Sequence, residues 1–188
     1  MSEAERYVVR PIRADEWPEA KALRLLALND PVAPIAFLQT HAEVAAEPDS
    51  YWQVRAQQAA TGIRRCQFVA EDRNGGLSGT VTVLIEDVDS DTPCDVAGPL
   101  CQAHIVGVFL RPEARGSGVI DALLEAAAAW AWSSPDVARV RLYVHEDNTR
   151  AERVYWRHGF VPSGEVIPMK GDSSKVEREL VLSRPKDR

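Results

Sequence analysis

The chain has 188 residues, 45% of them apolar and 27% charged, and a formal net charge of -6 at pH 7. These values are typical of one globular domain and exclude a disordered or collagen-like chain. The acidic balance argues against nucleic acid as the main partner, because phosphate contacts need a basic face, and it makes small cationic ligands easier to bind. We therefore expect a single domain over residues 1–188, in which residues 1–6 form a flexible tail.

The sequence also argues against a membrane partner. A membrane span needs about 18 uninterrupted apolar residues, and the richest run, residues 119–132, is interrupted by Asp121 and Glu125. The amino terminus is acidic, whereas a secretory signal begins with basic residues. These features favour a soluble protein in the cytoplasm.

The three cysteines, Cys66, Cys94 and Cys101, lack the short paired spacing of a zinc site. Their odd number is typical of a chain that stays reduced. A bridge between Cys94 and Cys101 is the less favoured alternative. We therefore expect thiols and no metal.

The first half of the chain predicts three strands and two helices. The strands are expected at residues 7–12, 66–71 and 77–87. The helices are expected from residue 15 or 16 to about residue 28, and from residue 49 or 50 to residue 62. The turn Asn74-Gly75-Gly76 tolerates a positive φ, so the second and third strands should form an antiparallel hairpin.

The second half predicts a strand at 103–110, a helix at 119–132, a strand at 137–145, a helix at 149–158 and a final hairpin at 160–182. The first of these strands is apolar almost throughout, which indicates a central place in the sheet. The helix that follows it has apolar residues at intervals of three and four, which makes one buried stripe, and it should form a parallel βαβ crossover. The predicted fold class is α/β, with a mixed, mostly antiparallel sheet of about seven strands flanked by about four helices.

A glycine-rich turn, Arg115-Gly116-Ser117-Gly118, lies between the central strand and this helix. Unpaired amides at a helix start can bind phosphate, and glycine leaves them accessible. The alternative is a plain strand-to-helix turn. The turn is neither a Walker loop, which would end in Gly-Lys-Ser/Thr, nor a dinucleotide fingerprint, because Asp121 stands at the third glycine position.

Two stretches resemble the signatures of the GNAT N-acetyltransferase family. Residues 108–119, VFLRPEARGSGV, resemble its acetyl-CoA signature, and residues 148–160 resemble the second signature, with Asn148, Ala151, Tyr155 and a closing Gly159-Phe160. The order of predicted elements from Tyr7 to Leu182 also resembles the fold of this family.

The resemblance implies acetyl-CoA as the cosubstrate. The backbone of Val108, Phe109 and Leu110 would then bind the pantetheine arm as an added strand would, and the amides from Gly116 to Asp121 would bind the pyrophosphate. The implied cofactor-binding set is Val108, Phe109, Leu110, Arg115, Gly116, Ser117, Gly118, Val119, Ile120, Asp121 and Asn148. Ile120 departs from the family, which usually has Gly or Ala there, so the first helical turn could be displaced or the side chain absorbed in the core.

Acyl transfer to an amine needs a base for the amine and an acid for the departing thiolate. Tyr155 resembles the family's general acid, and a phenol with an ordinary pKa of about 10 keeps its proton at neutral pH. Thr149 and Glu152 have the spacing of a capping box, which would begin its helix. The structural alternative for Tyr155 is a core tyrosine whose hydroxyl only finds a hydrogen-bond partner.

His104 is the candidate base, because it lies four residues before Val108, where several family members place a glutamate or histidine that faces the acceptor. The ordinary histidine pKa, near 6.5, suits proton removal at pH 7. The alternative is a strand histidine satisfied by structural hydrogen bonds. Glu86 and Asp87 are rival bases, an acidic lip that attracts a cationic substrate, or solvated charges at a hairpin end. His145 and Glu146 are reserve candidates.

The resemblance thus implies an acetyl-CoA-dependent N-acetyltransferase that acetylates a primary amine of a small molecule or peptide by direct attack. The alternative is a regulatory module of GNAT fold that binds CoA without turnover. The cysteines and the pair Trp130 and Trp132 are expected to serve packing only. The loops that would line the acceptor have no decodable signature, and exposed strand edges make a homodimer possible.

Overall fold

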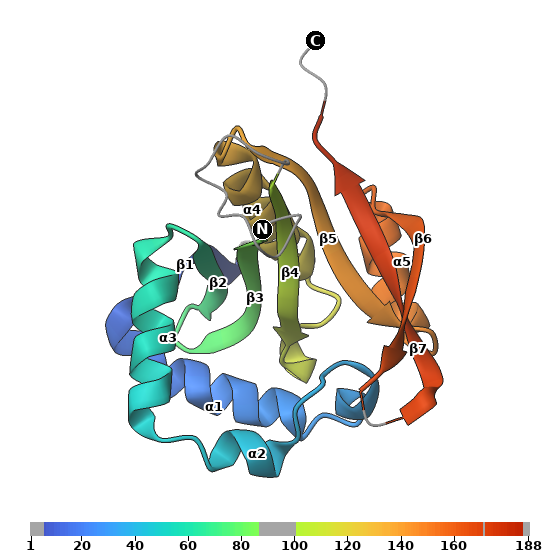
Figure 1. Cartoon of the computed structure of the whole chain (residues 1–188). Coiled ribbons are helices and arrows are strands. Elements are labelled where there is room, and N and C mark those ends of the chain that lie inside the picture. Colours follow the sequence, from blue (N-terminus) through green and yellow to red (C-terminus); the bar gives the residue numbers. More distant parts are fainter. Residues whose placement is uncertain (1–5, 87–100, 171, 186–188) are drawn as a thin grey trace.

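The computed structural model describes residues 6–86, 101–170 and 172–185, whose seven strands form one sheet (Figure 1). The strands stand in the order β1-β2-β3-β4-β5-β7-β6. Their bounds are β1 (Tyr7–Pro11), β2 (Arg65–Asp72), β3 (Leu77–Glu86), β4 (Cys101–Leu110), β5 (Val137–His145), β6 (Val161–Met169) and β7 (Asp172–Ser183). β4 and β5 are parallel, and the other neighbouring pairs are antiparallel. The predicted fold class is confirmed.

Five α-helices of the described residues cover the two faces of the sheet. They are α1 (Trp17–Leu28), α2 (His41–Ala45), α3 (Asp49–Thr61), α4 (Val119–Ser133) and α5 (Thr149–Arg157). α4 and α5 share one buried cluster with the sheet, and α1 and α3 share another on the opposite face. Helix α2 is the one that the sequence analysis missed, although Thr40 and Glu43 form a capping box at its start.

The apolar stripe of α4 explains how this helix holds the centre of the sheet. Leu123, Leu124 and Ala127 are almost fully buried and belong to the same cluster as Val81 of β3 and Val140 of β5. Burial of one leucine side chain contributes about 1.5–3 kcal/mol. The buried side chains between α4 and the sheet therefore hold in place the strands that border the candidate site.

A β-bulge at Gly107 changes the direction of β4 halfway along the strand. Thr80 of β3 lies opposite Phe109 and Thr82 lies opposite Val106, so β4 has one extra residue in this interval. Gly107 has a φ of 63°, a conformation that other residues rarely adopt. The bulge turns the second half of β4 relative to its first half.

β4 and β5 separate at the same level. Their pairing runs only from Cys101 opposite Val137 to His104 opposite Arg141, while β5 stays paired with β7 as far as His145. Figure 1 shows the two strands side by side at their start and diverging toward their ends. The edge of residues 105–110 that faces β5 therefore has no strand partner among the described residues.

Several sequence predictions need correction or fall outside the described residues. The predicted capping box at Thr149 is wrong, because Asn148 is the cap of α5: its Oδ1 atom accepts a hydrogen bond of 3.3 Å from the amide of Ala151. Cys101 is disulfide-bonded, so the expectation of a free thiol is wrong there. Cys94 and Asp87 lie outside the described residues.

The other sequence expectations on cysteine and tryptophan agree with the structure. Cys66 is a buried free cysteine, and burial raises the pKa of its thiol to about 11, which makes it a poor nucleophile. Trp130 and Trp132 are partly buried against the α4 cluster, as packing residues should be. None of the helices in the described ranges is long and apolar enough to cross a membrane.

Candidate active site

A cavity of about 1080 Å³ opens where β4 and β5 separate. The second halves of β4 and β5, the glycine turn and helix α5 form one part of its wall. Residues of α1, α2, α3, β2 and β3, of the segment between α1 and α2, and of the β6–β7 hairpin form the rest. One crevice thus brings together stretches that are more than a hundred residues apart in the sequence.

The glycine turn has the backbone geometry of an anion-binding site. Gly116 and Gly118 both lie in the left-handed region, with φ values of 82° and 85°, and Gly118 is the N-terminal cap of α4. The amides of Gly116, Ser117, Gly118 and Ile120 make no hydrogen bond within the described residues. A Cβ atom at Gly116 would meet nothing within 4 Å, so the space beside the turn is open.

Two amides that the sequence analysis assigned to the pyrophosphate already have partners. The amide of Asp121 donates to the carbonyl of Gly118 at 3.0 Å, and the amide of Val119 lies 3.4 Å from the hydroxyl of Ser117. The Ser117 hydroxyl itself donates to the carbonyl of Ala114 at 2.7 Å. The Ser117 hydroxyl therefore stabilises the turn, the Val119 side chain is buried in the core, and neither residue lines the cavity.

The remaining predicted cofactor residues line the cavity, namely Val108, Phe109, Leu110, Arg115, Gly116, Gly118, Ile120, Asp121 and Asn148. Arg115 is tied to the fold, because its guanidinium pairs with Asp30 and donates to the carbonyl of Leu110 at 3.2 Å. Ile120 is half-buried against the α4 cluster, so the core absorbs part of its extra bulk.

Asp121 places a carboxylate in the first turn of α4, close to the proposed anion site. Its Oδ1 atom accepts hydrogen bonds from Arg157 at 2.9 Å and from His158 at 2.8 Å. Burial alone would raise the pKa of Asp121, but these two bonds outweigh burial and lower it. The two partners therefore offset the negative charge that would otherwise repel a phosphate.

Tyr155 lies on α5 and lines the cavity, with only 7% of the residue exposed. Its ring packs against Phe160 in a T-shaped contact, with ring centres 6.0 Å apart. Burial raises the pKa of its phenol well above the ordinary value of 10. Among the described residues no group hydrogen-bonds to its hydroxyl, which leaves that hydroxyl available to a ligand.

His104 lines the same cavity and is held by Glu86 of β3. The His104 Nδ1 atom lies 2.8 Å from Glu86 Oε1, and the carboxylate can only accept, so Nδ1 donates and Nε2 remains as an acceptor. Arg141 donates to the other oxygen of Glu86 at 2.7 Å. Burial alone would raise the pKa of Glu86, but these partners lower it, so it remains a carboxylate.

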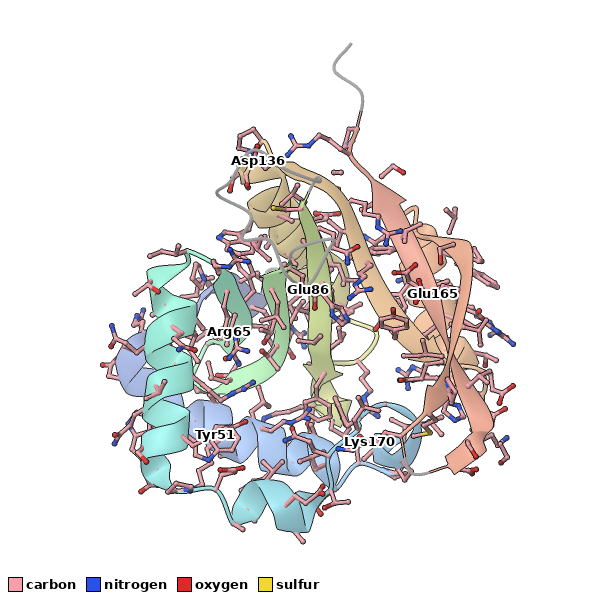
Figure 2. The ribbon with its side chains drawn as sticks, viewed as in Figure 1. Tyr51, Arg65, Glu86, Asp136, Glu165 and Lys170 are labelled. Atoms are coloured by element: carbon pink, nitrogen blue, oxygen red, sulfur yellow. The ribbon has the colours of Figure 1, made fainter. Side chains whose placement is uncertain are left out.

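Glu86 is thus not the solvated hairpin-end charge that the sequence suggested. Glu86 is the last residue of β3, and its side chain bridges His104 of β4 and Arg141 of β5 in the region that Figure 2 labels. Of the reserve candidates, His145 is buried in the cavity wall, where its Nδ1 atom accepts the amide of Asp147 at 3.0 Å. Glu146 lies outside the cavity and accepts the amide of Val176 at 3.2 Å.

Sequence reasoning missed the polar side chains that β5 and β7 add to this group. Tyr143 lines the cavity, accepts a hydrogen bond of 3.0 Å from Arg141, and donates to Glu165 of β6 at 3.4 Å. Arg141 also reaches Glu179 of β7, which is almost fully buried. The alternation of Arg139, Arg141, Tyr143 and His145 along one strand was a signal that one face of β5 is polar.

Comparison with known proteins matches residues 32–160 to the acetyltransferase (GNAT) family. A mycothiol acetyltransferase of Parafrankia sp. (strain EAN1pec) is 29% identical over 168 residues, which are 81% of this chain and 51% of that protein. The chain therefore spans about half the length of the curated relative it matches.

Solved structures agree on the fold. A GNAT acetyltransferase from Streptococcus pneumoniae superposes with a TM-score of 0.71 at 17% identity, covering 95% of this chain and 99% of that one. NAA60 of Arabidopsis thaliana in complex with acetyl-CoA gives a TM-score of 0.67 at 17% identity, covering 94% and 98%. With more than half of its residues inside the family match, the chain belongs to the GNAT family of acetyltransferases.

Proposed function

We propose that this protein is an acetyl-CoA-dependent N-acetyltransferase that acetylates a primary amine of a small molecule or peptide by direct attack. The observation that carries the proposal is one cavity in which open backbone amides, Tyr155 and His104 line a common space. Acetyl-CoA supplies an activated acetyl group as a thioester. The residues of the chain then have to bind this donor, deprotonate the amine and stabilise the departing sulfur.

Backbone groups would bind the donor. The amides of Gly116, Ser117, Gly118 and Ile120 are unpaired at the start of α4, where the helix dipole also favours an anion. The edge of residues 105–110 that faces β5 has no strand partner among the described residues either, and it offers main-chain donors and acceptors to an extended ligand that carries amide groups. The residues present therefore fit both the diphosphate and the pantetheine arm.

His104 would act as the general base. Its Nε2 atom is left as an acceptor because Glu86 binds Nδ1. As the amine nitrogen bonds to the carbonyl carbon, its proton passes to Nε2, directly or through a water molecule. Glu86 positions the ring and stabilises the imidazolium that results, and Arg141 in turn holds Glu86.

Tyr155 would act as the general acid. Burial raises its pKa, so the phenol stays protonated at any working pH. Such a weak acid first stabilises the sulfur by a hydrogen bond and transfers its proton as the carbon–sulfur bond breaks. The contact with Phe160 fixes the ring, so the hydroxyl needs no rearrangement during the reaction.

The acceptor follows only partly from these observations. A curated relative is named a mycothiol acetyltransferase, but the chain spans about half of that protein. We therefore propose that this chain transfers the acetyl group to a primary amine, and we do not assign the substrate of that relative to it. A homodimer stays a prediction; β1 and β6 are the two edge strands through which copies could pair.

Release of free CoA from acetyl-CoA in the presence of a primary-amine panel tests the proposal. We expect amine-dependent release and an acetylated product seen by mass spectrometry. His104→Gln should lower kcat/KM by about 100-fold, with donor affinity measured separately by calorimetry. Donor binding without release from any amine would favour the non-catalytic module, and an absence of donor binding would contradict the proposal altogether.

A further inference from the structure

The cavity is positively charged although the chain as a whole is negative. Arginine and lysine outnumber aspartate and glutamate among its lining residues, seven to two. Some of these cations lie on α5 and beside the glycine turn, where the donor's phosphates are expected. Arg24 of α1 and Arg55 of α3 lie elsewhere in the wall. With Arg65 of β2, which lines a neighbouring pocket, they form an arginine cluster that donor binding does not explain.

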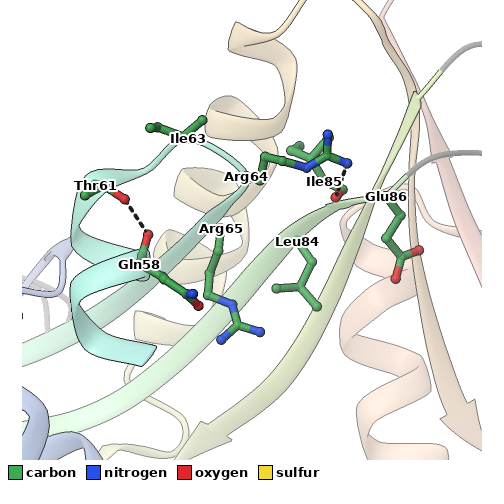
Figure 3. A pocket seen from close by; sticks show the side chains of 8 residues that line it. All are labelled: Gln58, Thr61, Ile63, Arg64, Arg65, Leu84, Ile85 and Glu86. Atoms are coloured by element: carbon green, nitrogen blue, oxygen red, sulfur yellow. Dashed lines mark hydrogen bonds between the residues drawn. The ribbon is translucent and has the colours of Figure 1, made fainter. Parts of the chain in front are cut away.

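The three residues of this arginine cluster come from different elements but share one side of the sheet. Arg65 precedes Gln67 by two residues on β2, so both side chains point to the same face, and Gln67 lines the cavity. Figure 2 shows Arg65 in front of β2 and Tyr51, which contacts Arg55, at the start of α3. In Figure 3, Arg65, Leu84 and Glu86 extend to the same side of their strands.

None of the three arginines forms an ion pair within the described residues. Arg24 donates to the side-chain oxygen of Gln39 at 3.2 Å, and its guanidinium stacks on Phe37 at 4.4 Å. Arg55 stacks on Tyr51 at 5.1 Å. Aromatic rings thus hold two of these cations in place without neutralising them.

Burying uncompensated cations near one another is unfavourable. Burial and the charge of Arg55 lower the pKa values of both Arg24 and Arg65. The indole nitrogen of Trp52, which follows Tyr51 on α3, is a further buried donor without a partner in the described chain. Three arginines without a carboxylate partner among the described residues, two in the wall of the cavity and one in the neighbouring pocket, are an arrangement that an anionic group would satisfy.

The strand register relates this cluster to the candidate base. Arg65 lies opposite Leu84, and Leu84 lies opposite His104. Neighbouring strands are about 4.8 Å apart, so the backbones of Arg65 and His104 are separated by about 10 Å. A molecule with an amine at one end and an anion at the other can reach both groups.

The donor's diphosphate would lie elsewhere. Leu110, beside the glycine turn, is six residues beyond His104 along β4. At about 3.3 Å per residue this is about 20 Å. Arg65 therefore lies nearer to the amine end of the cavity than to its phosphate end, and Arg55 is close enough to Arg65 to lower the pKa of its guanidinium.

We propose that the acceptor amine carries a carboxylate or phosphoryl group, and that Arg24, Arg55 and Arg65 bind this anion while the amine faces His104. The inference rests on the proposed acetyl transfer and names the class of acceptor. It also replaces the expectation from net charge that cationic ligands are favoured, because the charge of the cavity differs in sign from that of the chain.

Matched acceptors test the inference. Release of CoA is measured with 4-aminobutanoate, 6-aminohexanoate, the corresponding carboxamides and the corresponding aminoalkylphosphonates. The carboxylate or the phosphonate of at least one length should have a kcat/KM about tenfold or more above that of its amide, the change expected for one charge-assisted hydrogen bond. A comparison of kcat/KM for the carboxylates and the phosphonates shows whether the site binds a carboxylate or a phosphoryl group.

Variants then assign the preference to the arginine cluster. Arg24→Gln, Arg55→Gln and Arg65→Gln should each raise KM for the anionic acceptor and bring the anion-to-amide ratio toward one. Arg55→Glu should favour a diamine instead. Arg6→Gln is the matched control, because Arg6 is exposed and lies outside the cavity. Melting temperatures confirm that each variant is folded.

Two results would overturn the inference while leaving the acetyl transfer intact. One is an equal kcat/KM for acids and amides, and the other is an anion-to-amide ratio of kcat/KM that all three substitutions leave unchanged.

If no amine is acetylated, the proposed function fails. Calorimetry with 6-acetamidohexanoate then still decides whether the anion site exists. Binding of 6-acetamidohexanoate to the parent protein, with an affinity that falls about tenfold in Arg55→Gln, would support the anion site. Binding that is undetectable, or equal in both proteins, would overturn it.

Discussion

The two ends of the cavity are built by different means. The donor end comes from one continuous stretch, residues 105–120, and offers mainly backbone amides and an unpaired strand edge. The amine end is assembled from side chains on β2, β3, β4, β5, α1 and α3. The donor end depends on the positions of glycines, whereas the amine end depends on tertiary packing. The same kind of substitution should therefore act differently at each end.

The largest effect should come from the reacting end. Tyr155→Phe removes the proton donor and leaves the ring contact with Phe160, so kcat should fall by about 100-fold or more, with little change in the dissociation constant of acetyl-CoA. Steady-state kinetics and calorimetry separate the two. Tyr7→Phe is the control, since Tyr7 packs against the α4 cluster outside the cavity. Unchanged turnover in Tyr155→Phe would remove this residue from the mechanism.

A backbone change should damage the donor end instead. Gly118→Ala places a side chain at a φ of 85°, which costs about 1–2 kcal/mol, and it shifts the open amides, so donor affinity should fall about tenfold. Gly164→Ala is the matched control, because Gly164 has a φ of 95° but lies on β6 away from the cavity. Both variants should lose melting temperature. Equal donor affinity in both would refute a backbone-built donor site.

A positioning residue should have a smaller effect. Glu86→Gln keeps the shape of the side chain but removes the charge that stabilises protonated His104, so kcat/KM should fall about tenfold. Melting temperatures confirm that the variant is folded. Unchanged kcat/KM in the folded variant would show that Glu86 contributes to packing alone.

The smallest effect concerns the alkaline side of the pH profile of turnover. Because burial raises the pKa of Tyr155, its phenol should stay protonated past pH 10, the ordinary range of tyrosine. Turnover should therefore show no loss from this group between pH 8 and pH 10. Ultraviolet titration of the parent and of Tyr155→Phe should give superimposable curves over this range. A phenolate in the parent that the variant lacks would contradict the burial.

The fold was predictable because its signals are local. The three-four spacing of apolar residues identified α4, and Asn74-Gly75-Gly76 identified the hairpin of β2 and β3. Boundaries differed by a few residues, and one cap was misassigned: α5 begins at Thr149 as predicted, but Asn148 and not Thr149 caps it. The short α2 was missed, since five residues give no periodicity, although the capping box of Thr40 and Glu43 was present.

The candidate site was predictable only at its donor end. The glycine turn is a contiguous motif, and nine of the eleven residues expected to bind the cofactor line the cavity. The contact between Glu86 and His104 joins residues on separate strands, and the arginine cluster joins positions as distant as Arg24 and Arg65. Register and helix packing bring these together, and no local sequence pattern records either.

Hydrogen–deuterium exchange with and without CoA is the most direct test of the donor site. We predict slower exchange at the amides of Gly116, Ser117, Gly118 and Ile120, and at the amides of residues 106–110 that face β5. The rest of the sheet should change little. Saturating CoA that leaves these amides at their original exchange rates would contradict the account.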